Sequence, residues 1–261
     1  MRTLLAAVVV ALCCALPAAA QALEELTPYF STQYFTWTER SHGRRLLKEE
    51  GPLFSAGILL GAVPSSSLAI RGRGEVFGGE VGYRGETQAP ESIPVHTRVF
   101  YLGTKTELDL GYRLQAQAVR LEPFGGIGHR WWLRDLYDTN TADGTRVSGY
   151  TETWHMGYGR VGARAQIFLG AARIVAEGGA KYPFYTGNTV DFAGSGETTF
   201  HPKGRWSGFA ETGITYRNFN MVLLYEGFRF AQSDAEAVQG TNYFQPDSSS
   251  DIFGMRLGWS F

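Results

Sequence analysis

Residues 252–261 read IFGMRLGWSF, and two kinds of side chain alternate along this stretch. From residue 253 onward the even positions are glycine, arginine or serine, whereas the odd positions are Phe253, Met255, Leu257, Trp259 and Phe261. Successive side chains of a β-strand point to opposite faces, so a period of two is the pattern of a strand. The stretch therefore predicts a strand with one apolar face and one polar face.

The same alternation recurs along most of the chain. The chain has 33 glycines, 14% of its residues are aromatic, and no helical period is sustained. These features predict an all-β protein of about ten strands, with eight or twelve as the alternatives. The predicted strands lie near 28–38, 51–63, 68–84, 97–113, 117–133, 150–166, 171–185, 203–217, 219–232 and 250–261.

The two faces of a strand differ most clearly in the segment 97–113. From Phe100 to Tyr112 one face is aromatic, leucine or threonine, and both of its ends are aromatic. The other face carries charged side chains such as Lys105 and Glu107. A strand that has lipid on one side and a polar interior on the other shows this pattern.

Aromatic side chains also mark both ends of the apolar face in the segment 203–217. Trp206 and Tyr216 are ten residues apart, which in a tilted strand is about 25 Å along the membrane normal. That distance matches an apolar band between two aromatic girdles, a feature that a soluble sandwich does not need. The predicted girdle residues are Phe100, Tyr112, Trp206 and Tyr216.

The connections between the predicted strands alternate in length. The short ones are 64–67, 114–116, 168–170 and the turn at Asn218. The long ones are rich in Asp, Asn, Ser, Gly and Thr, and they are 40–50, 86–94, 134–149, 186–202 and 233–249. Transmembrane barrels have short turns on the periplasmic side and longer loops outside. We therefore expect an antiparallel up-and-down transmembrane β-barrel.

The segment 1–22 has the three parts of a secretory signal. Arg2 supplies a positive start, an apolar stretch follows, and the small residues PAAAQA allow cleavage after Ala20 or Ala22. The apolar stretch is shorter than the roughly 20 residues that a membrane-spanning helix needs. We expect export by the Sec pathway with removal of this signal peptide, which leaves 23–261 as the barrel domain.

Composition argues against several classes of function. The formal net charge is -1, so no nucleic-acid partner is expected. Both cysteines lie in the signal segment, so disulfides do not hold the barrel domain together. The loop 138–144 (DTNTADG) opens like a calcium loop, but Ala142 stands where an oxygen ligand is required. No metal and no cofactor is predicted.

The C-terminal stretch resembles the signal that the outer-membrane barrel assembly machinery recognises, because a terminal Phe261 follows alternating apolar residues. The phrase 121–128 (LEPFGGIG) also looks like a strand that recurs in small Gram-negative outer-membrane protein β-barrels, such as the transmembrane domain of OmpA-type proteins. The resemblance covers 23–261 and implies an integral outer-membrane protein. It also implies contacts with outer-membrane lipid and lipopolysaccharide, and with the assembly machinery and periplasmic chaperones during biogenesis.

Charged residues on the polar faces are expected to point into the barrel. Both signs are present, so they predict either a salt-bridged plug or a polar channel with ion selectivity. About ten strands is close to the eight whose interior side chains fill, which favours the plug. The predicted lumen residues are Arg71, Arg73, Glu75, Lys105, Glu107, Asp109, Glu122, Arg130, Glu177, Lys181, Arg205, Glu211 and Arg256.

Two predicted strands do not separate their faces. In 150–166 the residues Glu152 and Arg160 share a face with Trp154 and Tyr158, and 219–232 has a similar mixture. Either a β-bulge or an aromatic side chain inside the lumen would account for this mixture. The alternation alone leaves both possibilities open.

We expect a structural or passive role in the outer membrane with at most a narrow, porin-like pore, and no catalytic residue. One alternative is adhesion or ligand binding by the loops, whose aromatics are Tyr137, Tyr150, Tyr185, Phe192 and Tyr243. Another is a barrel enzyme that modifies lipid A or surface peptides, for which His155 with Ser148 or Thr153 is the candidate. The chain contains neither a GxSxG nor an HExxH motif.

Overall fold

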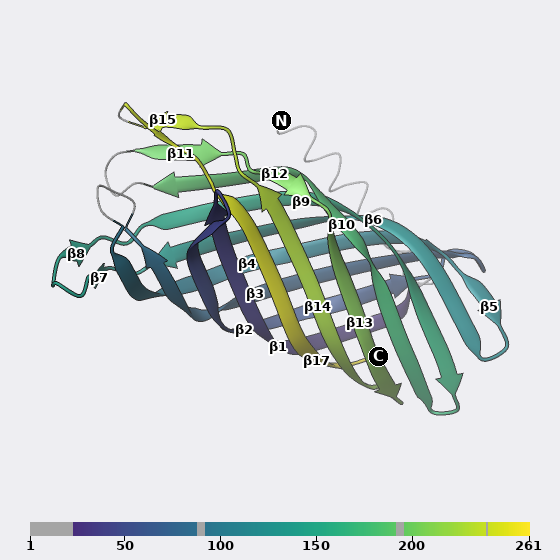
Figure 1. Ribbon diagram of the computed structural model, residues 1–261. Coiled ribbons are helices and arrows are strands. Elements are labelled where there is room, and N and C mark those ends of the chain that lie inside the picture. The colour runs from purple at the N-terminus through teal and green to yellow at the C-terminus, as the bar shows by residue number, and fades with distance from the viewer. Residues whose placement is uncertain (1–22, 88–91, 192–195, 239) are drawn as a thin grey trace, which may run out of the picture.

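The computed structural model describes residues 23–87, 92–191, 196–238 and 240–261. Over these ranges the protein is a closed antiparallel barrel of ten strands, as the alternation predicts (Figure 1). The segment 1–22, interpreted as a signal peptide, lies outside the described residues. Within them, no helix is long and apolar enough to cross a membrane.

Each barrel strand hydrogen-bonds to the next one in the sequence. In order around the barrel these strands are β1 (Leu23–Ser41), β2 (Arg44–Ala62), β3 (Leu68–Glu86), β4 (Pro94–Tyr112), β6 (Val119–Leu136), β9 (Thr151–Leu169), β10 (Ala172–Asp191), β13 (Ser207–Tyr216), β14 (Phe219–Ala231) and β17 (Asp247–Trp259).

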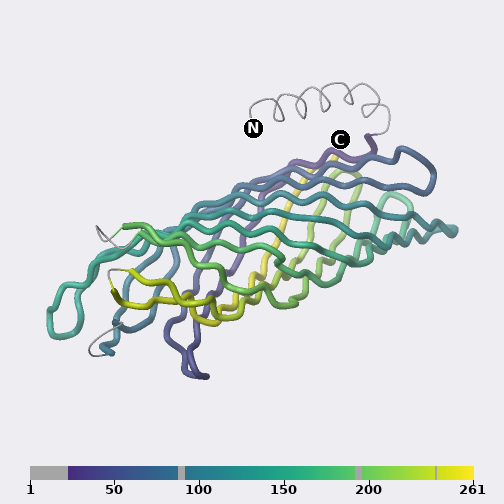
Figure 2. The backbone as a smooth tube through the Cα atoms, turned by 90° about the horizontal axis from the view of Figure 1, so that it is seen from above, coloured from purple at the N-terminus to yellow at the C-terminus, as the bar shows by residue number. Residues whose placement is uncertain are grey.

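Short strands extend the barrel or lie in its connections, and they are β5 (Leu114–Ala116), β7 (Thr139–Asn140), β8 (Arg146–Val147), β11 (Glu197–Phe200), β12 (Lys203–Arg205), β15 (Glu236–Val238) and β16 (Thr241–Tyr243). The hairpins β7–β8 and β15–β16 lie at one end of the barrel, which we call the loop end (Figures 1 and 2). The short connections from β2 to β3, from β9 to β10 and from β13 to β14 lie at the opposite, turn end.

The last strand closes the barrel against the first. Tyr29 lies opposite Gly258, and the antiparallel register continues without a shift to Arg40 opposite Asp247. In Figure 1 the yellow β17 accordingly lies beside the purple β1. Phe261 extends the contact, because its backbone N–H donates to the carbonyl of Leu26 at 3.0 Å. No strand edge is left unpaired along this seam. The apolar residues of β17 from Phe253 to Trp259 point outward, whereas Ile252 is buried in the lumen.

The predicted long connection 40–50 is wrong. β1 and β2 are joined by a tight turn at His42 and Gly43, both with positive φ, and β2 already begins at Arg44. The stretch 44–50 reads RRLLKEE, and its charges suggested a solvated loop. In the barrel its alternate residues Leu47 and Glu49 face inward and are buried, so the stretch continues the strand.

The mixed faces of β9 and β14 need no bulge in either strand. One continuous face of β9 points inward and includes Glu152, Trp154, Tyr158 and Arg160, all of them buried. β14 pairs with both of its neighbours without a register shift. Aromatic side chains therefore lie inside the lumen beside charged ones, which is the second of the two possibilities that the sequence left open.

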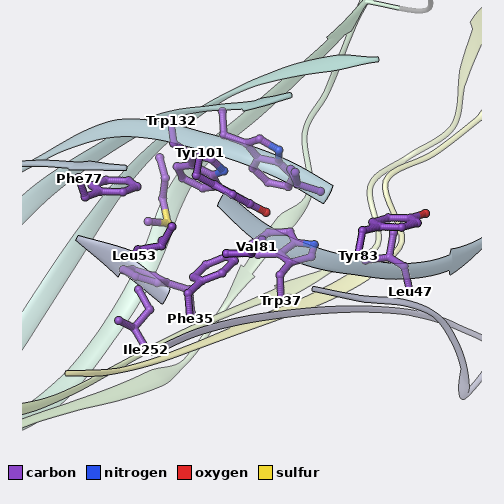
Figure 3. Packing of buried hydrophobic residues seen from close by; sticks show 14 of the residues in the cluster. Phe35, Trp37, Leu47, Leu53, Phe77, Val81, Tyr83, Tyr101, Trp132 and Ile252 are labelled. Carbon is purple, nitrogen blue, oxygen red and sulfur yellow. The ribbon is translucent and has the colours of Figure 1, made fainter. Parts of the chain in front are cut away.

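Buried aromatic and aliphatic side chains fill the loop-end half of the lumen (Figure 3). Phe77 and Leu53 lie at one end of this cluster, Tyr83 and Leu47 lie at the other, and Trp37 lies between them. Such a core inside the barrel requires that some inward positions be small. Gly103 is one: a Cβ there would stand 2.5 Å from the Phe77 ring and 2.8 Å from the Trp132 Cβ.

We expect Gly103→Val to destabilise the barrel by about 1–3 kcal/mol, because the new side chain overpacks against Phe77 and the neighbouring strand. Urea unfolding of the refolded protein in detergent, followed by the gel mobility of unheated samples, measures this loss. Thr104→Val, one residue along on the outward face, is the control and should unfold at the wild-type urea concentration. Equal stability of the two variants would contradict the packing described here.

Candidate functional site

The turn-end half of the lumen is filled by charged side chains that pair across the barrel. We call this set the ion-pair lattice. It holds equal numbers of basic and acidic groups, namely Arg71, Arg73, Lys105, Arg130, Arg160, Arg164, Lys181 and Arg256 with Glu25, Glu75, Glu107, Asp109, Glu122, Glu177, Glu211 and Glu226.

Arg160 is at the centre of the lattice. It contacts Glu107, its Nη2 lies 2.7 Å from Glu177 Oε1, and its Nε lies 3.5 Å from Asp109 Oδ1. Its guanidinium also lies 4.4 Å from the centroid of the Phe209 ring. One fully charged, planar side chain thus balances carboxylates from two other strands.

Glu226 is the acceptor at the aromatic side of the lattice. Lys181 contacts it directly, and Lys105 Nζ and Arg130 Nη1 lie 3.2 and 3.3 Å from its Oε2. Arg130 and Lys181 also lie over aromatic rings, at 4.1 Å from the centroid of Phe77 and 4.2 Å from that of Phe228. These cations join the charged half of the lumen to the aromatic half.

The predicted lumen residues lie together in the lattice, except Arg205. That arginine is in β12 opposite Arg229, its side chain is 59% exposed, and it pairs with Asp247 at 3.2 Å. The prediction that it faces the lumen is wrong. The strand is interrupted at Trp206, between β12 and β13, so the alternation of inward and outward side chains does not continue across that residue.

Four lattice members are absent from the predicted set: Glu25, Arg160, Arg164 and Glu226. Glu25 precedes the alternating part of its strand. The other three share a face with aromatic or aliphatic residues, which hid their inward orientation. For Arg160 and Arg164 the available signal was that they lie an even number of residues from Glu152, so that three charged residues share one face of β9.

A layer of aromatic side chains lies across the lumen next to the lattice, on the loop side. The rings of Trp132 and Trp154 stack at 5.1 Å, and Trp37 and Phe230 pack against Trp154 at 5.2 and 5.8 Å. We call these four residues, together with Phe35, Tyr101 and Phe228, the aromatic layer. A space of about 10 Å³ lies within it, and one of about 80 Å³ lies in the lattice. Neither is wide enough for a porin-like channel.

Three buried carboxylates and one arginine cover the loop side of the aromatic layer. Trp37 Nε1 donates to Glu39 at 2.9 Å, and Trp154 Nε1 donates to Glu152 at 2.8 Å. Arg134 donates to Glu152 at 2.6 Å and contacts Glu49. We call Glu39, Glu49, Glu152 and Arg134 the acidic floor, because carboxylates outnumber the cation.

Beyond the acidic floor a cavity of about 930 Å³ opens at the loop end, and we call it the mouth cavity. Glu39 and Glu152 form part of its base, and buried apolar residues such as Leu47 and Val95 form its wall. The predicted loop aromatics Tyr137, Tyr150 and Tyr243 also line it, whereas Tyr185 packs against His201 and Phe192 lies outside the described residues.

The loop 138–144 is held by hydrogen bonds within the hairpin rather than by any feature of a metal site. Asp138 accepts from Arg146 at 2.6 Å and from the backbone N–H of Gly149 at 2.8 Å. The hydrogen bond from Arg146 is the main reason that the pKa of Asp138 lies below its usual value. Among the described residues, no group of three or more His, Cys, Asp or Glu side chains could hold a metal ion.

Of the two candidate catalytic pairs, His155 with Ser148 is not assembled. His155 lies on the outward face of β9, where its ring is 5.9 Å from that of His129, whereas Ser148 lines the mouth cavity. Thr153 shares the outward face of β9 with His155.

The predicted girdle and assembly residues lie on the outer surface. Tyr112, Trp206 and Tyr216 are exposed, and Phe100 is half-buried. Trp206 also packs against the outward ring of Tyr182 at 5.2 Å. The apolar face of β17 is exposed as well, at Phe253, Met255, Leu257, Trp259 and, beyond the strand, Phe261.

Comparison with known proteins supports the fold. No family model matches the sequence, and no curated protein matches it. The outer membrane protease OmpT from Escherichia coli matches with a TM-score of 0.55 and 10% identity over 91% of this chain and 97% of that chain. The autotransporter NalP translocator domain from Neisseria meningitidis has a TM-score of 0.40 and 12% identity over 98% and 97%. Ail from Yersinia pestis has a TM-score of 0.30 and 10% identity over 91% and 99%.

These structural relatives are outer-membrane β-barrels of Gram-negative bacteria, and their names describe a protease, a translocator and an attachment protein. The likeness to OmpT shows that this chain has the barrel fold. At such low identity it shows the fold alone, and a shared fold does not imply a shared activity.

We expect Arg160→Met to destabilise the barrel by about 3 kcal/mol or more, because it removes the nearest cation of the buried Glu107 and one of the two arginines that pair with the buried Glu177. Urea unfolding in detergent measures the change. Arg205→Met is the matched control, since its ion pair is exposed and should contribute less than about 1 kcal/mol. If both variants unfolded at the same urea concentration, the lattice would not be an internal structural element.

Proposed function

We propose that the chain is an integral outer-membrane barrel with a structural or passive role and a sealed lumen that passes at most small ions. The observation that carries this proposal is the filling of the lumen by two successive blocks, the ion-pair lattice and the aromatic layer. Ten strands enclose a lumen only slightly wider than that of eight-stranded barrels, whose interior side chains fill them. Each charged member of the ion-pair lattice has an opposite charge nearby, which lowers the cost of a closed polar interior.

The outward surface supports the membrane location. Aromatic side chains occur at both ends of an exposed apolar band, as in barrels that contact lipid. In this proposal the turn end faces the periplasm, the loop end faces outward, and lipid and lipopolysaccharide surround the band. The segment 1–22 directs export, and 23–261 forms the barrel with help from periplasmic chaperones and the barrel assembly machinery.

Planar bilayer recordings test the sealed lumen. The wild-type protein should give no conductance steps of porin size, because the aromatic layer and the lattice leave no continuous wide path. Trp37→Ala with Trp154→Ala should make small steps larger or more frequent, since it opens the aromatic layer. Trp206→Ala, on the outer surface, is the control and should behave as wild type. Large steps from the wild-type protein would disprove the proposal.

The assembly signal is tested by deletion of Phe261. The deleted protein should lose most of its heat-modifiable form in outer-membrane fractions, because the terminal aromatic residue of β17 is gone. A Phe261→Trp variant keeps an aromatic end and should assemble normally. Full assembly of the deleted protein would show that the chain is not recognised through this terminus.

Ligand binding at the loop end is the second candidate function, and the mouth cavity favours it. Its volume is that of a small-molecule site, and its base is a rigid part of the barrel. The enzyme alternative has less support, because His155 and Ser148 lie on different sides of the barrel wall.

A further inference from the structure

The mouth cavity has the size and rigidity of a binding site. Its volume of about 930 Å³ falls within the range for drug-sized ligands, about 300–1,000 Å³. Its base is the acidic floor, which rests on the stacked rings of Trp132 and Trp154. The site is therefore built on barrel strands, whose side chains are held by packing, rather than on loops alone.

The acidic floor has one cation, Arg134, for three carboxylates. Arg134 contacts Glu49 and Glu152, but no Lys, Arg or His within 23–87, 92–191, 196–238 and 240–261 forms an ion pair with Glu39. Glu39 is nevertheless only 6% exposed. A buried carboxylate without a paired cation is costly, whereas a ligand that brings a positive charge would lower that cost.

The other charged groups around the cavity do not fill this role. Arg44 lines the cavity but pairs at the rim with Glu86, at 2.7 Å. His42 lies in the turn between β1 and β2 and accepts or donates a hydrogen bond with Ser41 at 3.0 Å. Neither of these basic residues that line the cavity thus forms an ion pair with Glu39.

Glu39 presents one oxygen to the cavity. Its Oε1 accepts from Trp37 Nε1 and from Gln245 Nε2, both at 2.9 Å. Among the described residues no donor reaches its Oε2, and the residue lines the mouth cavity. Two neutral donors thus hold the carboxylate in place and leave an acceptor for a ligand.

The wall of the cavity suits an apolar body. Leu47, Val95, Leu136 and Val147 line it together with Tyr83. An aromatic ring or alkyl chain would bury its surface against these groups, and tyrosine faces attract cations.

We propose that the mouth cavity binds an organic ammonium ion on an aromatic or alkyl body, with the ammonium at Glu39. The positive group donates to the free oxygen of the carboxylate, and the apolar body lies against the wall. Anions of the same shape are repelled by the acidic floor. This site goes beyond the passive role proposed above and does not depend on whether the lumen conducts.

The test uses the refolded full-length barrel in detergent and three probes of similar shape: 2-phenylethylamine, 2-phenylethanol and phenylacetate. Isothermal titration calorimetry measures their affinities at neutral pH. The amine should bind saturably and at least about tenfold more tightly than the alcohol, because a charged hydrogen bond is stronger than a neutral one. Phenylacetate should not bind.

Glu39→Gln keeps the size of the side chain and the acceptor for Trp37 but removes the charge. It should weaken amine binding about tenfold or more and reduce the preference for amine over alcohol. Glu236→Gln, in β15 and outside the cavity lining, makes the same change of net charge and should bind as wild type. If the amine were attracted only by the net charge of the loop end, both variants would bind it more weakly than the wild-type protein.

Val147→Trp provides a second variant if Glu39→Gln fails to fold. Val147 lines the cavity from the short strand β8, which is not one of the ten barrel strands. The larger side chain should therefore fill the cavity and abolish binding without disturbing assembly of the barrel. Equal affinity for amine and alcohol, or unchanged amine binding in Glu39→Gln or Val147→Trp, would overturn the proposal. So would the absence of saturable amine binding to the folded wild-type protein.

Discussion

The hydrogen-bonded seam between β1 and β17 is the constraint on which the rest of the structure depends. Backbone N–H and C=O groups that face lipid have no water to bond, so a sheet in a membrane must close on itself. Here the register runs without a shift from Tyr29 opposite Gly258 to Arg40 opposite Asp247. Closure after ten strands then sets the width of the lumen, and that width decides what the inward side chains must do.

A lumen this narrow brings inward residues of opposite strands into contact. Arg160 of β9 reaches Glu107 of β4 and Glu177 of β10, and Lys181 reaches Glu226 of β14. Packing alone would not bury so many charges, because each unpaired one would be costly. The ion-pair lattice holds equal numbers of basic and acidic groups, so its buried charges can pair with one another. The acidic floor differs, since Arg134 alone faces three carboxylates there, and this difference separates the mouth cavity from the sealed part of the lumen.

Much of the site could be predicted because alternation reports orientation directly. Lys105, Glu107 and Asp109 recur at every second position, and leucines lie on the other face of the strand. Their inward orientation could therefore be predicted from the sequence. The orientation of Arg160 and Arg164 could not be predicted, because their face also carries Trp154 and Tyr158 and the alternation did not choose between a bulge and aromatic side chains inside the lumen. Arg205 misled for the opposite reason: its strand alternates locally, but the break at Trp206 changes which face points inward.

The sequence by itself determined the all-β class, a count of about ten barrel strands with eight or twelve as alternatives, and the sorting of short and long connections, with 40–50 as the exception. These properties depend on residues close together in the chain, where alternation and turn composition act. Only the tertiary structure decided that tryptophans lie in the lumen, that Arg134 joins Glu49 to Glu152, and that Glu39 faces a cavity without a cation. Those relations join residues from different strands, and their distances exist only once the barrel has closed.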